Sequence, residues 1–356
     1  MIVHQLRALL NRPSRHRFTL IAVRDTDFPT VLGATTQPYA VLRAPFAGAQ
    51  RLQRILWEQT ALPALLHAST VDLLYAPGYL TSLGWHGLSV VFVHDTIALS
   101  HPHLCTWSNA LNYRVLLPPS ARHATRVVTP SHASAADVQR YCHVPSEHIA
   151  VVPLGVDILP FPSAEAITIA RKQVGVTGPF LLAVSTIEPK KNFVALIRWF
   201  GIWKRRGIPH QLLIIGKWGW KYGDVQRALQ DSPVSAQIVM PGYLAQEHLT
   251  ALMATADLLL MPSRYEGFGL PALEGLALGS PVVVSDQGAL PEAVGPAGMV
   301  LPLNDACWED EIPRLLLDPE RISALRAAGP PWAQAHSWAR HGDLLLDVFE
   351  ETLRAK

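Results

Sequence analysis

The segment 261–285, MPSRYEGFGLPALEGLALGSPVVVS, combines residue types that suit a ligand with phosphate and hydroxyl groups. Glu266 lies in the expected loop and Glu274 in the opening turn of the expected helix, so both carboxylates can face one crevice. Gly267 and Gly269 let the backbone turn tightly and approach a ligand. The helix that starts near Pro271 offers unpaired N–H groups to a phosphate, and carboxylates accept charge-assisted hydrogen bonds from hydroxyls.

Each part of this segment also has an ordinary structural explanation. A glutamate at a helix start often only compensates the helix dipole, and Gly-x-Gly loops are common. The combined string is more specific than either part. It also follows the apolar run 257–261, and open α/β sheets bind ligands at the carboxyl ends of their strands.

The elements that must position this segment alternate along the chain. Short apolar runs, which predict buried parallel strands, occur at 18–23, 71–75, 88–93, 125–129, 149–152, 180–185, 211–216, 237–240, 257–261, 281–284 and 298–301. Segments with helical periodicity separate them, for example 192–206, 245–255 and 271–279. This pattern predicts an α/β protein with two doubly wound units. We expect domains at 1–165 and 166–335, and a terminal helix over 336–356, because the Pro- and Gly-rich stretch after residue 153 resembles a linker.

Composition excludes several classes of protein. The chain has 356 residues, of which 49% are hydrophobic and 16% charged, so it is not intrinsically disordered. No apolar stretch approaches the roughly 18 residues of a membrane span, and the first residues lack the features of a signal peptide. The three cysteines form no C-x2-C pair, which argues against a zinc ribbon. These features predict a reduced, cytoplasmic protein.

The positive charge is uneven. Residues 1–165 contain 12 Arg and no Lys, and Arg7, Arg12, Arg15 and Arg17 cluster at the start. This cluster is either a solvated helix face or a patch that contacts an anionic membrane or a lipid phosphate. Nucleic acid is not expected as a partner, because no nucleic-acid-binding motif accompanies the basic residues.

At EGFGLPALE the sequence resembles the E-x7-E motif of the retaining family-four glycosyltransferases of the GT-B fold. VSTIEPKKNF (184–193), LLIIGKWGW (212–220), SDQGALPEAVGPAG (285–298) and VFVHD (91–95) resemble other landmarks of that family. The resemblance implies two Rossmann-like domains with a cleft between them. It is closest to bacterial polysaccharide mannosyltransferases.

The resemblance also implies roles for individual residues. Glu266 would bind hydroxyls of the transferred sugar, and Glu274 would bind the ribose of the nucleotide. Lys191, with support from Lys190, would hold the diphosphate together with the backbone amides of Gly267, Phe268, Gly269 and Leu270. Gly216 and Lys217 would border the base, Ser131 would lie near the cleft, and His94 would approach the reacting sugar from the opposite domain.

Several of these residues have simpler alternatives. Lys190 and Lys191 could be solvated charges before a helix, and His94 could be a satisfied core histidine. Asp95 could position His94 or only begin a turn. Glu188 is expected to cap a helix or to have a structural role. Trp218 and Trp220 could stack on a base or pack in the core.

The resemblance implies a metal-independent hexosyltransferase without a cofactor. GDP-mannose is the first expectation for its donor, and a glycan or lipid-linked hydroxyl is expected as its acceptor. A sugar-nucleotide epimerase and a non-catalytic nucleotide-sugar-binding protein are the alternatives.

Two departures from the family pattern accompany these expectations. Thr186 occupies a position where many members have an arginine, which leaves the diphosphate one partner fewer. The chain also opens directly with HQLRALL, which resembles the family's first helix. The strand and glycine-rich loop that usually precede this helix are therefore expected upstream of Met1 or lost, and their absence is expected to lower stability and activity.

Overall fold

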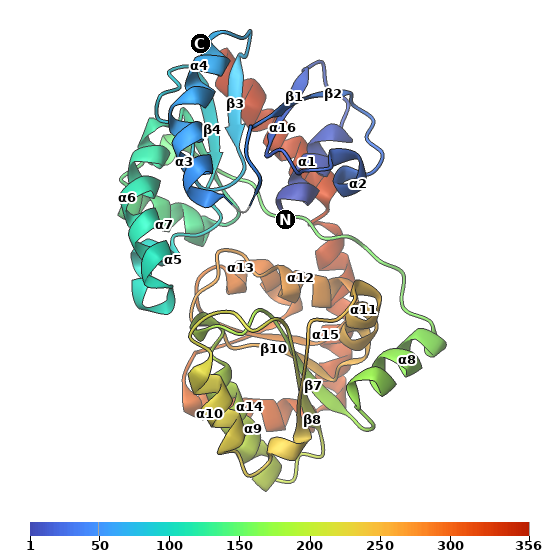
Figure 1. Ribbon diagram of the computed structural model, residues 1–356. Helices are drawn as coiled ribbons and strands as arrows, with labels where there is room; N and C mark the ends of the chain where they lie inside the picture. The colour runs from blue at the N-terminus through green and yellow to red at the C-terminus, as the bar shows by residue number, and fades with distance from the viewer. Residues whose placement is uncertain (49, 356) are drawn as a thin grey trace. The chain divides into compact units, whose positions relative to one another are not determined.

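The computed structural model describes residues 1–48 and 50–355 and divides into two compact units (Figure 1). Unit 1 comprises Met1–Leu99, Leu111–Gly155 and Trp338–Lys356. Unit 2 comprises Ser100–Ala110 and Val156–Ser337. The chain therefore contributes the short segment Ser100–Ala110 to unit 2, returns to unit 1, forms the rest of unit 2 and ends in unit 1 with its last helix.

Unit 2 is built on a six-stranded parallel sheet with the order β12-β11-β10-β7-β8-β9. Its strands are almost entirely apolar, because both faces of the sheet are covered by helices. The strands are β7 (Phe180–Val184), β8 (Gln211–Ile215), β9 (Ile238–Gly242), β10 (Leu258–Met261), β11 (Val282–Ser285) and β12 (Met299–Leu301). The helices are α8 (Ala164–Val174), α9 (Phe193–Arg205), α10 (Gly223–Gln230), α11 (Gln246–Thr255), α12 (Leu270–Ala277), α13 (Leu290–Val294), α14 (Asp305–Leu316) and α15 (Pro319–Gln334).

The order of the strands reverses at β7. The chain proceeds from β7 to β8 and β9 on one side and later places β10 to β12 on the other side. Connections on the two sides of such a reversal run over opposite faces of the sheet, and the carboxyl ends of the strands on either side of it are where open α/β sheets bind ligands.

Large aromatic side chains anchor α9 and α14 to this sheet. The rings of Trp199 and Trp308 stack with their centroids 5.1 Å apart, and Trp203 is fully buried beside them. The indole N–H groups of two of these residues are hydrogen-bonded. Trp199 Nε1 donates to Asp305 Oδ1 at 2.8 Å, and Trp203 Nε1 donates to the Trp308 carbonyl at 3.2 Å. Burial of these large rings, two of which also have a satisfied N–H group, stabilises the packing of α9 and α14 on the sheet.

Unit 1 contains two separate parallel sheets, β1-β2 and β3-β4-β5-β6. The strands are β1 (Phe18–Ala22), β2 (Tyr39–Arg43), β3 (Leu73–Ala76), β4 (Leu88–Phe92), β5 (Arg126–Thr129) and β6 (Ile149–Val151). The helices are α1 (Ile2–Leu10), α2 (Phe28–Leu32), α3 (Arg51–Gln59), α4 (Ala61–His67), α5 (Ile97–Ser100), α6 (Trp107–His123), α7 (His132–Cys142) and the terminal helix α16 (Trp338–Arg354). The last residue of α5 and the first four residues of α6 fall in the segment Ser100–Ala110, which belongs to unit 2.

Helices α1 and α16 lie side by side, although they are at opposite ends of the chain (Figure 1). Arg12 donates two hydrogen bonds of 2.5 Å to the Asp343 carboxylate, and Arg15 Nη2 lies 3.2 Å from Glu350. Arg7 donates to the carbonyl groups of α2 at Val31 and Leu32. Three of the four clustered arginines thus bind groups inside unit 1.

The predicted α/β class with parallel sheets is confirmed, and each of the apolar runs proposed as a strand forms one. The strand β2 was not predicted, because its sequence YAVLR is short and its side chains are half-buried or exposed. In the part of the chain that the structure describes, no helix is both long and apolar enough to cross a membrane.

Candidate functional site

The loop that follows β7 brings two lysines to the carboxyl end of the central strands. After Val184 the chain passes through a 3-10 turn, Pro189–Lys191, and Asn192 then adopts a left-handed conformation with φ 59° before α9 begins. Asparagine tolerates this conformation better than most residues do. The turn is tied to the neighbouring loop, because the Arg264 amide donates to the Lys190 carbonyl at 2.7 Å.

The loop that follows β10 places Glu266 against these lysines. Lys191 Nζ donates to Glu266 Oε1 at 2.5 Å, and the Ser263 hydroxyl donates to the same oxygen at 2.8 Å. Lys190 Nζ lies 3.8 Å from Glu266 Oε2. Glu266 and Ser263 are buried. The ion pair between Lys191 and Glu266 is therefore largely desolvated, and it lies where the strand order reverses.

The charge state of Glu266 follows from its neighbours. Burial pushes its pKa upward, but the positive charges of Lys191 and Lys190 and the hydrogen bonds from Lys191 and Ser263 outweigh burial, and the pKa lies below its usual value. Glu266 is therefore ionised at neutral pH, and both of its oxygens can only accept hydrogen bonds.

Glu188 adds a second buried carboxylate to this cluster. It is 3% exposed, its Oε1 lies 3.6 Å from Lys190 Nζ, and its Oε2 has no hydrogen-bond partner in the structure. Burial raises its pKa, although Lys190 and Lys191 act in the opposite direction. Glu188 occupies the N-cap position of the turn that follows but makes no side-chain capping hydrogen bond there, so of the two expected roles, capping or structural, the structure favours the structural one.

The glycines after Glu266 have a structural reason. Gly269 has φ 115° and forms the N-terminal cap of α12, and a Cβ atom there would lie 2.8 Å from Leu290. Gly288 packs against the backbone of this loop, and only glycine fits there because a Cβ atom would lie 2.4 Å from the Glu266 carbonyl oxygen. Phe268 is buried and Leu270 opens the helix, so the backbone from Gly267 to Leu270 forms a tight turn into the N-terminus of α12.

The loop that follows β8 completes this end of the sheet. A Cβ atom on Gly216 would lie 1.8 Å from the Ser185 carbonyl oxygen, so only glycine fits between the two loops. Lys217 Nζ lies 4.6 Å above the Tyr243 ring, and the Lys217 carbonyl accepts a hydrogen bond from the Ile187 amide at 2.8 Å. Trp218 is 41% exposed and contacts Tyr222, which excludes core packing for Trp218.

Glu274 lies on α12, one turn into the helix. Burial raises its pKa to about 7, and the negative charge of Asp157 contributes in the same direction. Its carboxyl group therefore changes protonation near neutral pH, unlike that of Glu266.

In unit 1, His94 follows β4 and is almost completely buried. Its Nε2 lies 2.8 Å from the Pro77 carbonyl, which assigns the ring proton to Nε2, and its Nδ1 has no partner in the structure. Burial lowers its pKa to about 4, although the Pro77 hydrogen bond opposes this shift. His94 is thus a neutral imidazole with an acceptor nitrogen at neutral pH.

The neighbours of His94 have separate roles. Asp95 accepts hydrogen bonds from the Ile97 amide at 3.2 Å and from the Tyr79 hydroxyl at 3.1 Å, which is the turn-forming alternative. Ser131 is the N-cap of α7, because its hydroxyl accepts from the Ser134 amide at 3.0 Å. This capping bond gives Ser131 a structural function in unit 1.

Two family profiles together match most of the chain. Residues 1–158 match the family described as Glycosyltransferase Family 4, and residues 167–331 match the one described as Glycosyl transferases group 1. O-antigen chain mannosyltransferase B of Escherichia coli is 30% identical over 254 residues, which are 70% of this chain and 67% of that protein. The chain belongs to the family-four glycosyltransferases.

Further similarities agree with this family. The GDP-mannose-dependent alpha-(1-6)-phosphatidylinositol monomannoside mannosyltransferase of Mycolicibacterium smegmatis is 30% identical over 280 residues, which are 73% of this glycosyltransferase and 71% of that protein. The crystal structure of Anabaena HepE in complex with UDP and glucose superposes with a TM-score of 0.75 and 19% identity, and the match covers 98% of this chain and 94% of that one. The GT-B fold is confirmed.

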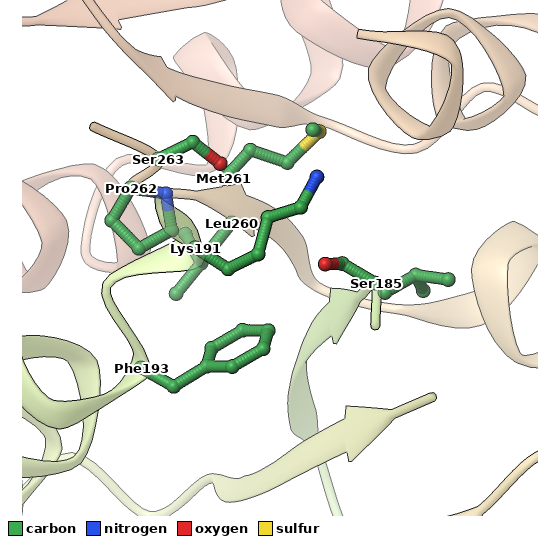
Figure 2. Close-up of a pocket in the computed structure, with 8 residues that line it drawn as sticks. Ser185, Lys191, Phe193, Leu260, Met261, Pro262 and Ser263 are labelled. Carbon is green, nitrogen blue, oxygen red and sulfur yellow. The ribbon is translucent and has the colours of Figure 1, made fainter. Parts of the chain in front are cut away.

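A small pocket marks the floor of the site in unit 2 of the glycosyltransferase. Its volume is about 10 Å³, the space of about one water molecule, so it is far too small for a nucleotide sugar. Figure 2 shows Lys191 and Ser263 among the side chains that line this pocket. The lining residues are Val184, Ser185, Lys191, Phe193, Leu260, Met261, Pro262 and Ser263.

The structure thus brings Lys190, Lys191 and Glu266 into contact, and it places Gly267 to Leu270 directly after them. His94 and Ser131 belong to unit 1. Sequence reasoning missed Ser263 as a partner of Glu266 and Glu188 as a member of the charge cluster. The sequence EPKK contained a signal for Glu188. A glutamate that lies close to two lysines, just after an apolar strand, can form an ion pair with one of them.

Proposed function

We propose that this glycosyltransferase transfers mannose from GDP-mannose to a hydroxyl of a glycan or lipid-linked oligosaccharide, with retention of the anomeric configuration and without a metal ion. The names of the two mannosyltransferase relatives support the sugar, and one of them also supports the nucleotide. The buried pair of Lys191 and Glu266 at the reversal of strand order is the observation that carries the proposal.

In the proposal, the donor binds along the carboxyl ends of β10, β7 and β8. Glu266 Oε1 is already occupied by Lys191 and Ser263, so Oε2 is the oxygen that accepts hydrogen bonds from the mannose hydroxyls. The ribose contacts Glu274, and the base lies beside Gly216 and Lys217. The exposed ring of Trp218 offers a stacking surface near them.

The chemical step breaks the bond between the sugar and the diphosphate. Negative charge grows on the leaving oxygen, and donors that are already in place lower the barrier because they need no reorganisation. The ammonium group of Lys191 has N–H donors beyond the one that Glu266 accepts, and the amides at the start of α12 add the positive end of the helix dipole. The acceptor hydroxyl attacks from the face that the diphosphate leaves, which retains the configuration.

His94 contributes an uncharged acceptor to this proposal. Its Nδ1 is aligned by the hydrogen bond of Nε2 to Pro77, and it accepts a hydrogen bond from a sugar hydroxyl without adding a second positive charge. The enzyme is proposed to work in the cytoplasm, with peripheral contact to the inner face of an anionic membrane.

Incubation with a panel of nucleotide sugars tests the proposal. We expect slow release of GDP from GDP-mannose in the absence of acceptor, and a loss of at least about a hundredfold in this rate for Glu266→Gln. Conversion of one sugar nucleotide into another would identify an epimerase. Binding without turnover would identify a non-catalytic protein, and unchanged turnover in Glu266→Gln would reject the assigned site.

A further inference from the structure

The two lysines of the site in unit 2 are balanced by two buried carboxylates. Lys191 Nζ lies 2.5 Å from Glu266 Oε1, whereas Lys190 Nζ lies 3.6 Å from Glu188 Oε1 and 3.8 Å from Glu266 Oε2. When both carboxylates are ionised, the charges of these four groups sum to zero. A diphosphate brings further negative charge, so the cluster binds it more strongly if one of the carboxylates becomes neutral.

Glu188 is better suited than Glu266 to gain a proton. Glu266 Oε1 accepts hydrogen bonds from Lys191 and Ser263, and despite burial these bonds and the lysine charges hold its pKa below the usual value. Glu188 is 3% exposed, and its Oε2 has no hydrogen-bond partner among the residues that the structure describes. Burial raises its pKa, against the charges of Lys190 and Lys191. A buried charged oxygen without a partner is costly, and protonation removes that cost.

The surroundings of Glu188 fix its position. The charged groups that act on it are the two lysines of its own turn and Glu266 on the loop after β10. The loop after β8 contributes Gly219, whose amide donates to the Ile187 carbonyl at 3.0 Å. A Cβ atom on Gly219 would lie 3.7 Å from the Glu188 Cβ atom, so the two loops are in close contact there. The backbone at Glu188 is thus held while the charge of its side chain is free to change.

We propose that Glu188 is a positioning residue of the donor site, which binds a proton from solvent when a diphosphate binds to Lys190 and Lys191. In the free enzyme the ionised carboxylate holds the ammonium group of Lys190. When the diphosphate accepts hydrogen bonds from Lys190, Glu188 loses this partner and gains a negative neighbour, and both changes favour its protonated form. The proton returns to solvent when the diphosphate leaves. This inference rests on the proposed function, because the diphosphate is that of the nucleotide-sugar donor.

Calorimetric titration of the full chain with GDP-mannose and with UDP-glucose, at pH 6 and at pH 8, tests this proposal. The diphosphates of both compounds are diesters, which do not titrate in this range. At pH 8 the wild type must take up a proton or bind the donor against the charge of Glu188, whereas Glu188→Gln is neutral at every pH. We expect Glu188→Gln to bind the donor at least about fivefold more tightly than the wild type at pH 8, and within about twofold of it at pH 6.

The matched control is Glu320→Gln, which removes the same charge from an exposed position in the first turn of α15. Its donor affinity should equal that of the wild type at both pH values. The other titratable groups are common to all three proteins, so their contributions cancel in the comparison. Titration in buffers of different ionisation enthalpy counts the proton directly, and the wild type should take up more protons at pH 8 than Glu188→Gln.

A purely structural role of Glu188 predicts a different result. If its ion pair with Lys190 only fixes the turn, Glu188→Gln binds the donor no more tightly than the wild type at pH 8 and takes up as many protons. That outcome, or an equal gain of affinity in Glu320→Gln, would overturn the role of Glu188 and leave the proposed function intact. Failure of the wild type to bind either nucleotide sugar would reject the proposed function and this inference together.

Discussion

At the scale of single residues, the central feature is a carboxylate held ionised in a nearly water-free position. A buried charge is costly unless a partner of opposite sign and hydrogen bonds compensate for it. Glu266 has both, since Lys191 and Ser263 bind one oxygen and Lys190 lies near the other. The same lysine that stabilises Glu266 is proposed to stabilise the leaving diphosphate, so the cluster links folding to catalysis.

Removal of Lys191 should therefore affect activity more than removal of Lys190. We expect Lys191→Met to lower kcat about a hundredfold and Lys190→Met to have a smaller effect, because the Nζ of Lys191 is 2.5 Å from Glu266 and that of Lys190 is 3.8 Å away. The double variant Lys191→Met, Glu266→Gln serves as the control for stability, since it leaves no unpaired charge. Recovery of activity in that double variant would contradict a catalytic role for Lys191.

Glu274 provides a pH-dependent test of ribose binding. Its pKa of about 7 means that the carboxyl is protonated below neutral pH and becomes a stronger acceptor as the pH rises. We expect the affinity for GDP to increase between pH 6 and pH 8 by more in the wild type than in Glu274→Gln, as measured by calorimetry. Equal pH dependence in both proteins would mean that Glu274 does not contact the nucleotide, because the titration of the phosphate is common to both.

At the scale of elements, the site depends on contacts between the loops at the carboxyl ends of the strands. The loops after β7 and β8 are joined by the hydrogen bonds of Ile187 with Lys217 and Gly219, and Gly216 lies against Ser185. The loop after β10 joins them through Arg264 and Lys190. These contacts hold Lys191 and Glu266 in place on a rigid sheet rather than on free loops.

Gly216→Ala tests this contact between loops. A Cβ atom 1.8 Å from the Ser185 carbonyl oxygen forces the two loops apart, and we expect a loss of about 3 kcal/mol in the free energy of unfolding of unit 2. Gly178→Ala is the control, because a Cβ atom there meets no atom within 4 Å. Urea unfolding that shows equal stability for both variants would contradict the proposed steric role of Gly216.

The elements themselves could be predicted because local patterns determine them. The apolar runs of β7, β8 and β10 and the Pro271 helix start were sufficient to place the ends of the strands. The hydrogen bond of Lys191 with Glu266 could not be predicted in this way, because it depends on how two loops meet that are 75 residues apart in sequence. The short-range contacts of Ser263 with Glu266 and of Glu188 with Lys190 depend on the irregular conformation of each loop, which apolar periodicity does not determine.

At the scale of the molecule, two buried histidines make unit 1 sensitive to acid. Burial lowers the pKa of both His94 and His341 to about 4, from 6.5 in the unfolded chain. The unfolded state therefore binds more protons between pH 6.5 and pH 4, and stability falls as the pH falls through this window.

The expected loss at pH 5 is about 2 kcal/mol for each histidine, relative to pH 7. Replacement of His341 by Gln should reduce the difference in unfolding free energy between pH 7 and pH 5 by about that amount, as measured by urea unfolding at both pH values. A variant that loses as much stability as the wild type over this range would contradict a buried, neutral His341.

The return of α16 to unit 1 also has a consequence for the order of folding during synthesis. Arg12 and Asp343 are 331 residues apart, so the contact between α1 and α16 forms only after nearly the whole chain has left the ribosome. Unit 2 needs nothing beyond Ser337. Unit 2 can therefore complete its fold before unit 1 does. Until α16 has been synthesised, the apolar face of α1 that packs against it stays uncovered. Chaperones and proteases can bind α1 during this time.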